Sequence, residues 1–277
     1  MTRPLLILTP DHYPGMCNAY LAYANIKAFS LKLNAQPAIL FPSETPDLSL
    51  SPMLRSRVWI KLARLLTLPI KVLSRIIPSF SPFFVTYYFN PESSCSLFET
   101  FIRHPAKIVI LRGWGYSDNQ LLDQYRAQIL RQMHITQPKT YSDSTKLNKV
   151  PTLGVHVRRT DYKHFQGGRF YYSYSIYLHW IEHVRSLIGQ VQIIFFSDDP
   201  TYVSKYLGGQ GRLNNGSAKE DLALLSQCDF ILGPPSTFSM WATFIGNKSA
   251  MHMYQSRPTS HDVFVPWQKL IAYNACA

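Results

Sequence analysis

Thr152-Leu-Gly-Val-His-Val-Arg-Arg-Thr-Asp-Tyr162 is the stretch of sequence that decides the fold. Its first part, residues 152–157, is apolar and predicts a strand. The strand ends abruptly in two arginines and an aspartate, so its carboxyl end opens into a cationic loop. Arginine carries a fixed positive charge and a fork of donors that suits phosphate. The loop is therefore a candidate pyrophosphate site, although an isolated Arg-Arg pair is more often a solvated basic turn.

Strand-like and helix-like segments alternate on both sides of this stretch. This alternation predicts an α/β fold with parallel strand pairing. The expected strands are residues 5–9, 37–41, 107–111, 152–157, 191–196, 230–232 and 250–254. The expected helices are residues 19–33, 119–133, 172–187, a short one from Pro200, 219–226 and 237–245.

A polar stretch rich in Lys, Ser and Thr, residues 137–150, has no apolar periodicity and predicts a linker. The 277 residues are enough for two modest lobes with real cores. We therefore expect one lobe at residues 1–140 and a second at residues 150–277.

The net charge of +12 is concentrated in the first lobe, since residues 1–150 carry 17 Lys and Arg against 8 Asp and Glu. Such an excess indicates an anionic partner. The four cysteines are scattered without metal-ligand spacing, which favours reduced thiols in a cytoplasmic protein and no metal. The apolar N-terminal run is too short for a signal peptide, and no apolar run approaches the length of a membrane span.

Three expected strands of the second lobe end in unusual polar sequence, at residues 156–161, 197–200 and 234–239. In open parallel sheets, ligands bind outside the carboxyl ends of the strands. The arginines could neutralise a diphosphate, and the aspartates could accept hydrogen bonds from a nucleoside. The hydroxyl-rich segment could open a helix whose free amides favour phosphate. The residues concerned are Arg158, Arg159, Asp198, Asp199, Ser236, Thr237 and Ser239.

Each of these elements also has a plain structural interpretation. The hydroxyl-rich segment could only cap a helix, the Asp-Asp-Pro sequence could be a turn, and Asp161 could orient an arginine without touching substrate. His156 lies within the strand, which favours a hydrogen-bonded core histidine. Together, however, the three ends favour a nucleoside-diphosphate site. They contain neither a dinucleotide-binding glycine fingerprint nor a P-loop, which argues against those two classes of enzyme.

The same residues resemble a known family. The segments HVRRTDY (156–162), FSDDP (196–200) and DLALLSQCDFILGPPSTFSMWA (221–242) are similar in order and spacing to family 11 glycosyltransferases. These are α-1,2-fucosyltransferases within the HxRRxD fucosyltransferase group, and the resemblance covers residues 150–255. It implies a GT-B-like fold, with two Rossmann-like lobes and a cleft between them.

The resemblance further implies an inverting transfer of fucose from GDP-fucose to a glycan, with no metal and no cofactor. In such enzymes the arginines, here Arg158 and Arg159, hold the pyrophosphate and stabilise the departing GDP. Asp198 and Asp199 would face the nucleoside. The remaining donor-site candidates are His156, Ser236, Thr237, Phe238 and Ser239.

The chain departs from the family pattern at two places. Gly15-Met-Cys-Asn18 has a cysteine where the family has a second glycine, and Thr160 stands where α-1,2 enzymes have glycine. The HVRRTD form is more similar to α-1,6-fucosyltransferases, so the linkage stays open. Gly15, Asn18 and His12 are expected on an acceptor-side loop.

The catalytic base stays open among four residues. Asp11 and His12 follow the first strand and would face the cleft from the acceptor side, whereas Asp161 and His164 would do so from the donor side. We favour Asp11 slightly, although an ordinary loop aspartate is an equally good interpretation.

Residues 48–91 contain no acidic residue but six basic ones, and residues 53–77 predict a basic amphipathic helix kinked near Pro69. Such a helix could lie on an anionic membrane at residues 55–77, which would suit a lipid-linked acceptor. It could equally pack its apolar face on the first lobe.

Alternatives for the whole chain are a glycosyltransferase that uses a different nucleotide-sugar donor, or a non-catalytic protein of the same fold that binds a glycan or an anionic surface. Nucleic acid is disfavoured, because no recognition motif for it is visible.

Overall fold

The computed structural model describes residues 6–9, 15–34, 36–39, 72, 84–89, 101, 108–113, 118–133 and 150–274. The chain divides into two units, residues 1–136 with 271–277, and residues 137–270. The predicted lobes were residues 1–140 and 150–277. They differ from these units because the prediction placed residues 271–277 in the second lobe. Their functional assignments stay predictions. The basic segment at residues 53–77 lies outside the described residues, except for Val72, which is exposed.

The first unit contains a parallel sheet in the order β2-β1-β4-β3. Its strands are β1 (Leu6–Thr9), β2 (Gln36–Ile39), β3 (Phe84–Phe89) and β4 (Ile108–Gly113). Helix α1 (Met16–Leu33) joins β1 to β2 and contacts α4 (Asn119–Gln132). Asp118 is the N-cap residue of α4. Its backbone N–H donates a hydrogen bond to Oδ1 of Asn25 on α1 over 3.0 Å.

The second unit is built on a six-stranded sheet in the order β10-β9-β8-β5-β6-β7. All neighbouring strands are parallel except the edge pair of β9 and β10. The strands are β5 (Thr152–Val157), β6 (Gln192–Ser197), β7 (Arg212–Leu213), β8 (Phe230–Gly233), β9 (Ser249–His252) and β10 (Val265–Pro266). Its helices are α5 (Tyr174–Ile188), α6 (Pro200–Tyr206), α7 (Ala218–Leu225) and α8 (Thr237–Gly246). Helix α9 (Trp267–Asn274) begins in this unit, and its residues from 271 on belong to the first.

Strand β5 lies at the centre of this sheet, between β6 and β8. Leu153, Val155 and Val157 are fully buried and belong to the core that also holds Trp180 of α5. A central strand of a parallel sheet is covered on both faces, which explains the nearly unbroken apolar run at residues 152–157. The predicted α/β class with parallel sheets is confirmed, and β5 has the predicted bounds.

Some elements were missed. Strands β7 and β10 are only two residues long each and carry little pattern. Strand β3 and helix α9 were also not predicted, and α1 begins at Met16, three residues before its predicted start. The helix begins directly after Gly15, whose φ of 84° is left-handed and suits glycine.

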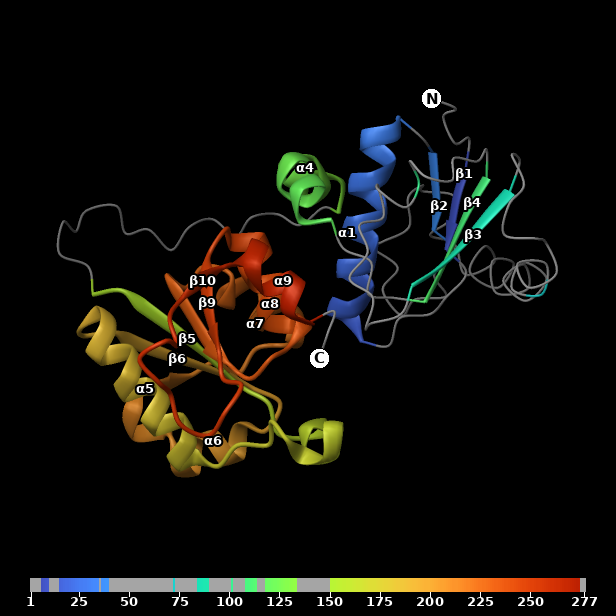
Figure 1. Cartoon of the computed structure of the whole chain (residues 1–277). Coiled ribbons are helices and arrows are strands. Elements are labelled where there is room, and N and C mark those ends of the chain that lie inside the picture. The colour runs from blue at the N-terminus through green and yellow to red at the C-terminus, as the bar shows by residue number, and fades with distance from the viewer. Residues whose placement is uncertain are drawn as a thin grey trace. The chain divides into compact units, whose positions relative to one another are not determined.

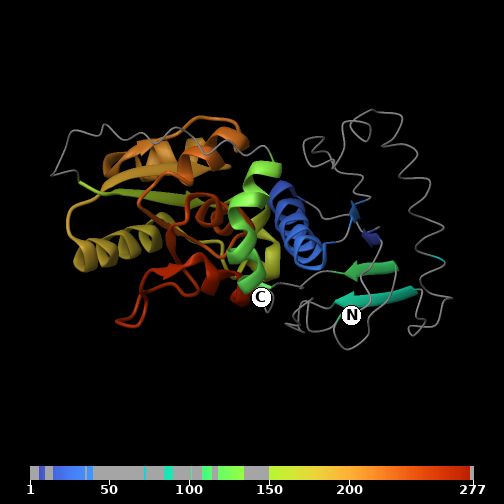
Figure 2. The same ribbon diagram turned by 90° about the horizontal axis from the view of Figure 1, so that it is seen from above.

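The sheet reverses its direction of growth between β5 and β8. From β5 the chain continues through α5 to β6, and from β8 it continues through α8 to β9 on the other side of the sheet. Because such crossovers are right-handed, α5 and α6 cover one face of the sheet, and α7 and α8 cover the other (Figure 1); Figure 2 gives the same units from above. Ligands of open α/β sheets bind at this kind of switch point, which here joins the carboxyl ends of β5 and β8.

The position of α8 depends on a close backbone approach at its last residue. A Cβ atom added to Gly246 would lie 1.9 Å from the carbonyl oxygen of Ser226. We expect Gly246→Ala to lower the free energy of unfolding by about 2 kcal/mol, because the two backbones would have to separate. Gly209→Ala is the matched control, since a Cβ there meets nothing within 4 Å. Urea denaturation compares the two variants, and equal midpoints would contradict this prediction.

Candidate functional site

The loop after β5 holds Arg158 against the carboxylate of Asp161. The Nε atom of Arg158 donates to Oδ1 over 2.8 Å, and Nη2 donates to Oδ2 over 2.9 Å. Burial lowers the pKa of Arg158, but the hydrogen bond with Asp161 and the charge of Asp198 raise it by more, so the net shift is upward. About a third of the Arg158 side chain stays exposed. The result is a permanent cation that is fixed in place and open to a ligand.

Asp198, after β6, fastens this loop to its neighbouring strand. Its carboxylate accepts hydrogen bonds from the backbone of Arg159 over 2.8 Å and of Thr160 over 3.2 Å, and from the Thr160 hydroxyl over 2.6 Å. It also lies 3.4 Å from Nε of Arg158. Through these contacts Asp198 holds the loop after β5 in place. The resemblance to the family instead implied that Asp198 contacts the nucleoside.

The rest of the SDDP segment is also engaged in local structure. Ser197 donates to the carbonyl oxygen of Val157 over 2.9 Å and accepts from the backbone of Asp199 over 3.0 Å. Asp199 caps α6, since its Oδ1 accepts from the backbone of Tyr202 over 3.0 Å, and Pro200 fills the first helical position. The carboxyl ends of β5 and β6 are thereby joined into one rigid edge.

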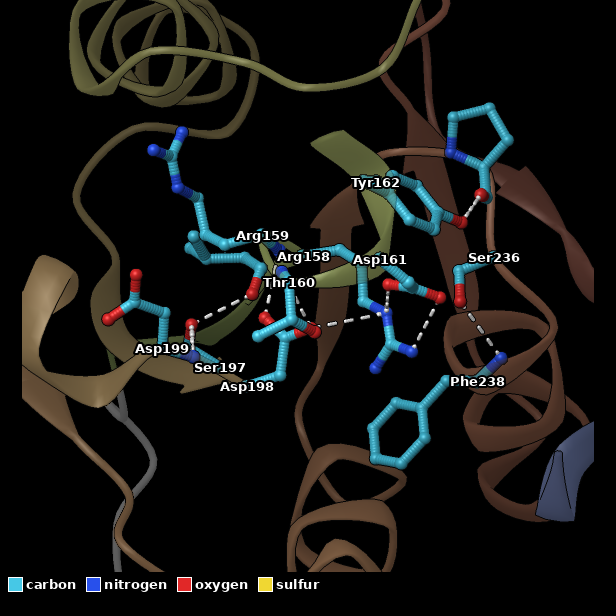
Figure 3. Close-up of polar contacts among 12 residues, drawn as sticks. Arg158, Arg159, Thr160, Asp161, Tyr162, Ser197, Asp198, Asp199, Ser236 and Phe238 are labelled. Carbon is cyan, nitrogen blue, oxygen red and sulfur yellow. Dashed lines mark hydrogen bonds and ion pairs between the residues drawn. The ribbon is translucent and has the colours of Figure 1, made fainter. Parts of the chain in front are cut away.

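The two arginines do not act as a pair. Their guanidinium groups point in opposite directions (Figure 3). That of Arg159 is inserted between the rings of Tyr171 and Tyr202, with its central carbon 3.9 Å and 3.8 Å from their centroids. Both residues follow β5, which ends at Val157. Side chains alternate along a strand, and continuing that alternation past Val157 would have predicted the separation.

The carboxyl end of β8 supplies the start of α8. Ser236 is the N-cap, and its hydroxyl accepts from the backbone of Phe238 over 3.2 Å. The Tyr162 hydroxyl donates to the carbonyl oxygen of Pro235, which ties the loop after β5 to the loop after β8. Figure 3 shows Arg158 on the side where Ser236 and Phe238 lie. A fixed cation and a helix N-terminus therefore meet at the switch point, and both favour phosphate.

Two buried histidines lie beneath the start of α8. His156 faces the ring of Phe238 at 5.0 Å between centroids, and its Nδ1 atom is buried without a hydrogen-bond partner. Burial, together with the charge of Arg158, lowers the pKa of His156 to about 3. His252 lies 3.0 Å from the Ser239 hydroxyl, and burial lowers its pKa to about 4. Both imidazoles are neutral at physiological pH, as expected of core histidines.

These pKa values predict a loss of stability in mild acid. A histidine in the unfolded chain has a pKa near 6.5. Between that pH and the lower pKa of the folded protein, the unfolded chain binds more protons than the folded one, so stability falls as the pH falls. His252 then costs about 2 kcal/mol of stability at pH 5 relative to pH 7. We expect His252→Gln to be less stable at pH 7 but to lose about 2 kcal/mol less between these pH values. Denaturant unfolding at both pH values measures the difference, and parallel losses in the two proteins would contradict it.

The structure gathers most of the predicted donor-site residues at one edge. Arg158, Asp161, Asp198, His156, Ser236 and Phe238 all lie on the loops of β5, β6 and β8 or beside them. Thr237 begins α8 and is half-buried, whereas Ser239 is fully buried and bonded to His252. His164 is exposed on the loop after Asp161.

The remaining predicted residues belong to the first unit. Gly15 and Asn18 lie at the start of α1 in the first unit. Asp11 and His12 lie outside the described residues. Sequence reasoning missed Thr160, Ser197 and Tyr162 as members of the site, although all three stand inside the quoted motifs.

The described part of the chain contains neither a candidate metal site nor a candidate membrane span. Within it, no group of three His, Cys, Asp or Glu side chains is arranged to hold a metal ion. None of its helices combines the length and the apolar character needed to cross a membrane.

Several solved structures are similar to this chain at low identity. The fucosyltransferase NodZ from Bradyrhizobium is 12% identical, with a TM-score of 0.48 over 96% of this chain and 99% of that chain. POFUT1 in complex with GDP is 12% identical, with a TM-score of 0.45 over 90% and 98%. A family 9 glycosyl transferase from Veillonella parvula is 10% identical, with a TM-score of 0.41 over 89% and 79%. Likenesses of this size carry no conclusion about activity.

The sequence itself gives a firmer comparison. A search of curated proteins finds no significant match. The profile of glycosyl transferase family 11 matches residues 120–264. This range is more than half of the 277 residues, and it includes all three polar strand ends. The chain therefore belongs to glycosyl transferase family 11.

Proposed function

We propose that this glycosyltransferase moves fucose from GDP-fucose to a hydroxyl group of a glycan, with inversion, without a metal, and with an α-1,2 linkage as the expected product. The observation that carries the proposal is the meeting of Arg158 with the start of α8 at the switch point of the second unit. Departure of GDP places negative charge on the diphosphate. Preorganised cationic and amide donors can stabilise that charge.

Arg158 is the proposed catalytic residue for this step. A guanidinium has five N–H donors, so the two directed at Asp161 leave others for the diphosphate oxygens. The free amides at the start of α8 would bind the same oxygens from the other side. Asp199 is the proposed nucleoside contact, since only one of its carboxylate oxygens caps α6, and buried His156 is assigned to the support of Phe238. We assign Asp198 and Arg159 to positioning, because the Asp198 carboxylate and both terminal nitrogens of Arg159 are already engaged within the protein.

The proton of the acceptor hydroxyl needs a base or a loose transition state. Both oxygens of Asp161 are occupied by Arg158, which disfavours it as the base. Asp11 stays our proposed base, with His12 and His164 as alternatives. Asp11→Asn should lower kcat with little effect on the Kd for GDP if this proposal holds.

A donor screen tests the proposed function. The purified chain is incubated with GDP-fucose, GDP-mannose, UDP-galactose, UDP-N-acetylglucosamine and CMP-sialic acid, with and without EDTA, and release of the nucleotide is measured. We expect hydrolysis of GDP-fucose alone, unchanged by EDTA. Turnover of a UDP-sugar would favour the alternative donor class, and GDP binding without turnover of any donor or transfer to any glycan would favour a non-catalytic protein.

Contact of residues 55–77 with an anionic membrane, and with it a lipid-linked acceptor, is a further proposal that rests on sequence alone. Flotation with phosphatidylserine vesicles tests it, and a protein that stays in the unbound fraction would overturn it.

A further inference from the structure

A row of aromatic rings leads away from the site along the face covered by α5 and α6. Its rings are Tyr171, Tyr202, Tyr206 and Tyr174, in that order, and we call this row the tyrosine ladder. The guanidinium of Arg159 fills the first gap, between Tyr171 and Tyr202. The next two rings are 4.9 Å apart, and Tyr206 stacks on Tyr174 at 5.2 Å with only 10° between the planes.

The ladder is held rigidly. Arg159 donates to the carbonyl oxygen of Tyr172 over 2.8 Å and to the Tyr171 hydroxyl over 2.5 Å. Tyr202 and Tyr206 are four residues apart on α6, so they share one face of that helix. Tyr174 is the first residue of α5, and α5 and α6 cover the same face of the sheet (Figure 1). A ligand that binds here would therefore find the rings already ordered, which lowers the entropic cost of binding.

The ladder is also open to solvent. Tyr171 is 36% exposed, Tyr174 is 43% exposed and Tyr206 is 42% exposed, and they rank among the most exposed large apolar side chains of the described residues. Single exposed apolar residues are ordinary, but a contiguous aromatic patch marks a binding surface. Packing of the core does not explain these three rings, because each leaves more than a third of its surface in water.

We propose that the tyrosine ladder is a subsite for the acceptor glycan, which binds sugar units remote from the hydroxyl that receives the transferred group. This inference rests on the proposed function. A pyranose ring has an apolar C–H face and a rim of hydroxyls, and a tyrosine offers it an apolar face together with a polar tip. The ladder begins at Arg159, whose backbone is bonded to Asp198 at the same strand ends that carry Arg158, while its guanidinium points away from that of Arg158 (Figure 3). A glycan along the ladder would therefore place there the sugar units that are remote from the transfer.

The charges around the ladder agree with a neutral or acidic glycan. Arg159 is part of it, and the ammonium of Lys205 lies 5.0 Å from the centre of the Tyr206 ring. The four rings carry hydroxyl groups, and the ladder contains no aliphatic side chain. These hydroxyl groups and the two cations can donate hydrogen bonds to the hydroxyl rim and any acidic group of a glycan, so a glycan is the favoured occupant and a second protein copy is an outcome of the test.

The first experiment measures glycan binding. The fluorescently labelled chain is applied, with GDP present, to an array of neutral and acidic oligosaccharides of one to eight sugars. We compare wild type, Tyr174→Ala/Tyr206→Ala, Tyr174→Phe/Tyr206→Phe and Leu187→Ala, which removes a side chain of similar exposure from the other end of α5. We expect wild type, the Phe variant and the Leu187 variant to bind one class of longer glycans. The Ala variant should lose at least about tenfold in affinity.

The second experiment uses the glycans bound by wild type as acceptors. In the Ala variant we expect the acceptor KM to rise about tenfold or more for the long glycan but not for its terminal disaccharide, while kcat and the KM for GDP-fucose stay unchanged. No glycan bound by wild type, equal KM values in wild type and the Ala variant, or self-association of wild type that the Ala variant abolishes would each overturn the ladder proposal. Loss of GDP binding and of donor hydrolysis in wild type would instead refute the proposed function.

Discussion

Arg158→Ala is expected to abolish measurable GDP binding and to reduce donor turnover by at least about a thousandfold. A charge-assisted contact from arginine to phosphate is among the stronger protein hydrogen bonds. Removing one preorganised donor from a developing oxyanion costs about 10²–10³ in rate. Here the cation is lost as well, and the Asp161 carboxylate, no longer neutralised, would face the diphosphate.

Calorimetric titration with GDP and donor hydrolysis measure the two effects. Arg185→Ala is the matched control. Arg185 is also an arginine of the second unit, paired with Glu182 at 2.5 Å three residues before it, but it lies on α5 away from the switch point. The control should bind GDP as wild type does. Arg158→Lys should recover part of the affinity but not all, since an ammonium keeps the charge and loses the fork. Normal GDP binding by Arg158→Ala would remove the basis of the proposed function.

Asp198→Asn is expected to lower both stability and GDP affinity, although the side chain keeps its size. The carboxylate accepts three hydrogen bonds from Arg159 and Thr160 and lies 3.4 Å from Arg158. An amide offers one acceptor oxygen and places N–H donors against these donors. Hydrogen bonds to charged groups contribute about 1.5–3 kcal/mol each. We therefore expect about 3 kcal/mol less stability and a GDP Kd weakened about tenfold or more by the displaced Arg158.

A pair of variants at Thr160 separates positioning from direct contact. Thr160→Val removes only the hydroxyl that donates to Asp198, and we expect about 1 kcal/mol less stability and a smaller loss of GDP affinity. Thr160→Ser keeps the hydroxyl and should resemble wild type. Denaturant unfolding and GDP titration give both quantities. If Asp198→Asn lost GDP binding with stability unchanged, Asp198 would contact the nucleoside directly, as the resemblance to the family first implied.

Local sequence patterns were enough for most of the elements that build the site. The apolar run of β5 gave its bounds, Asp199 and Pro200 marked the start of α6, and Ser236 marked the start of α8. These signals work because a strand, a cap and a first turn each depend on neighbours within a few residues. These signals failed for β7 and β10, because two residues are too few to show a pattern. These strands form by pairing with the edges of β6 and β9.

The sequence by itself determined the α/β class, the three polar strand ends and the family. Only the tertiary structure decided what each polar side chain does, because that depends on partners far away along the chain. Asp198 meets residues 158–160 from the neighbouring strand, and Tyr162 meets Pro235 more than seventy residues on. Arg159 became a support between two tyrosines rather than a phosphate ligand beside Arg158, because the fold brings Tyr171 and Tyr202 to it from later parts of the chain.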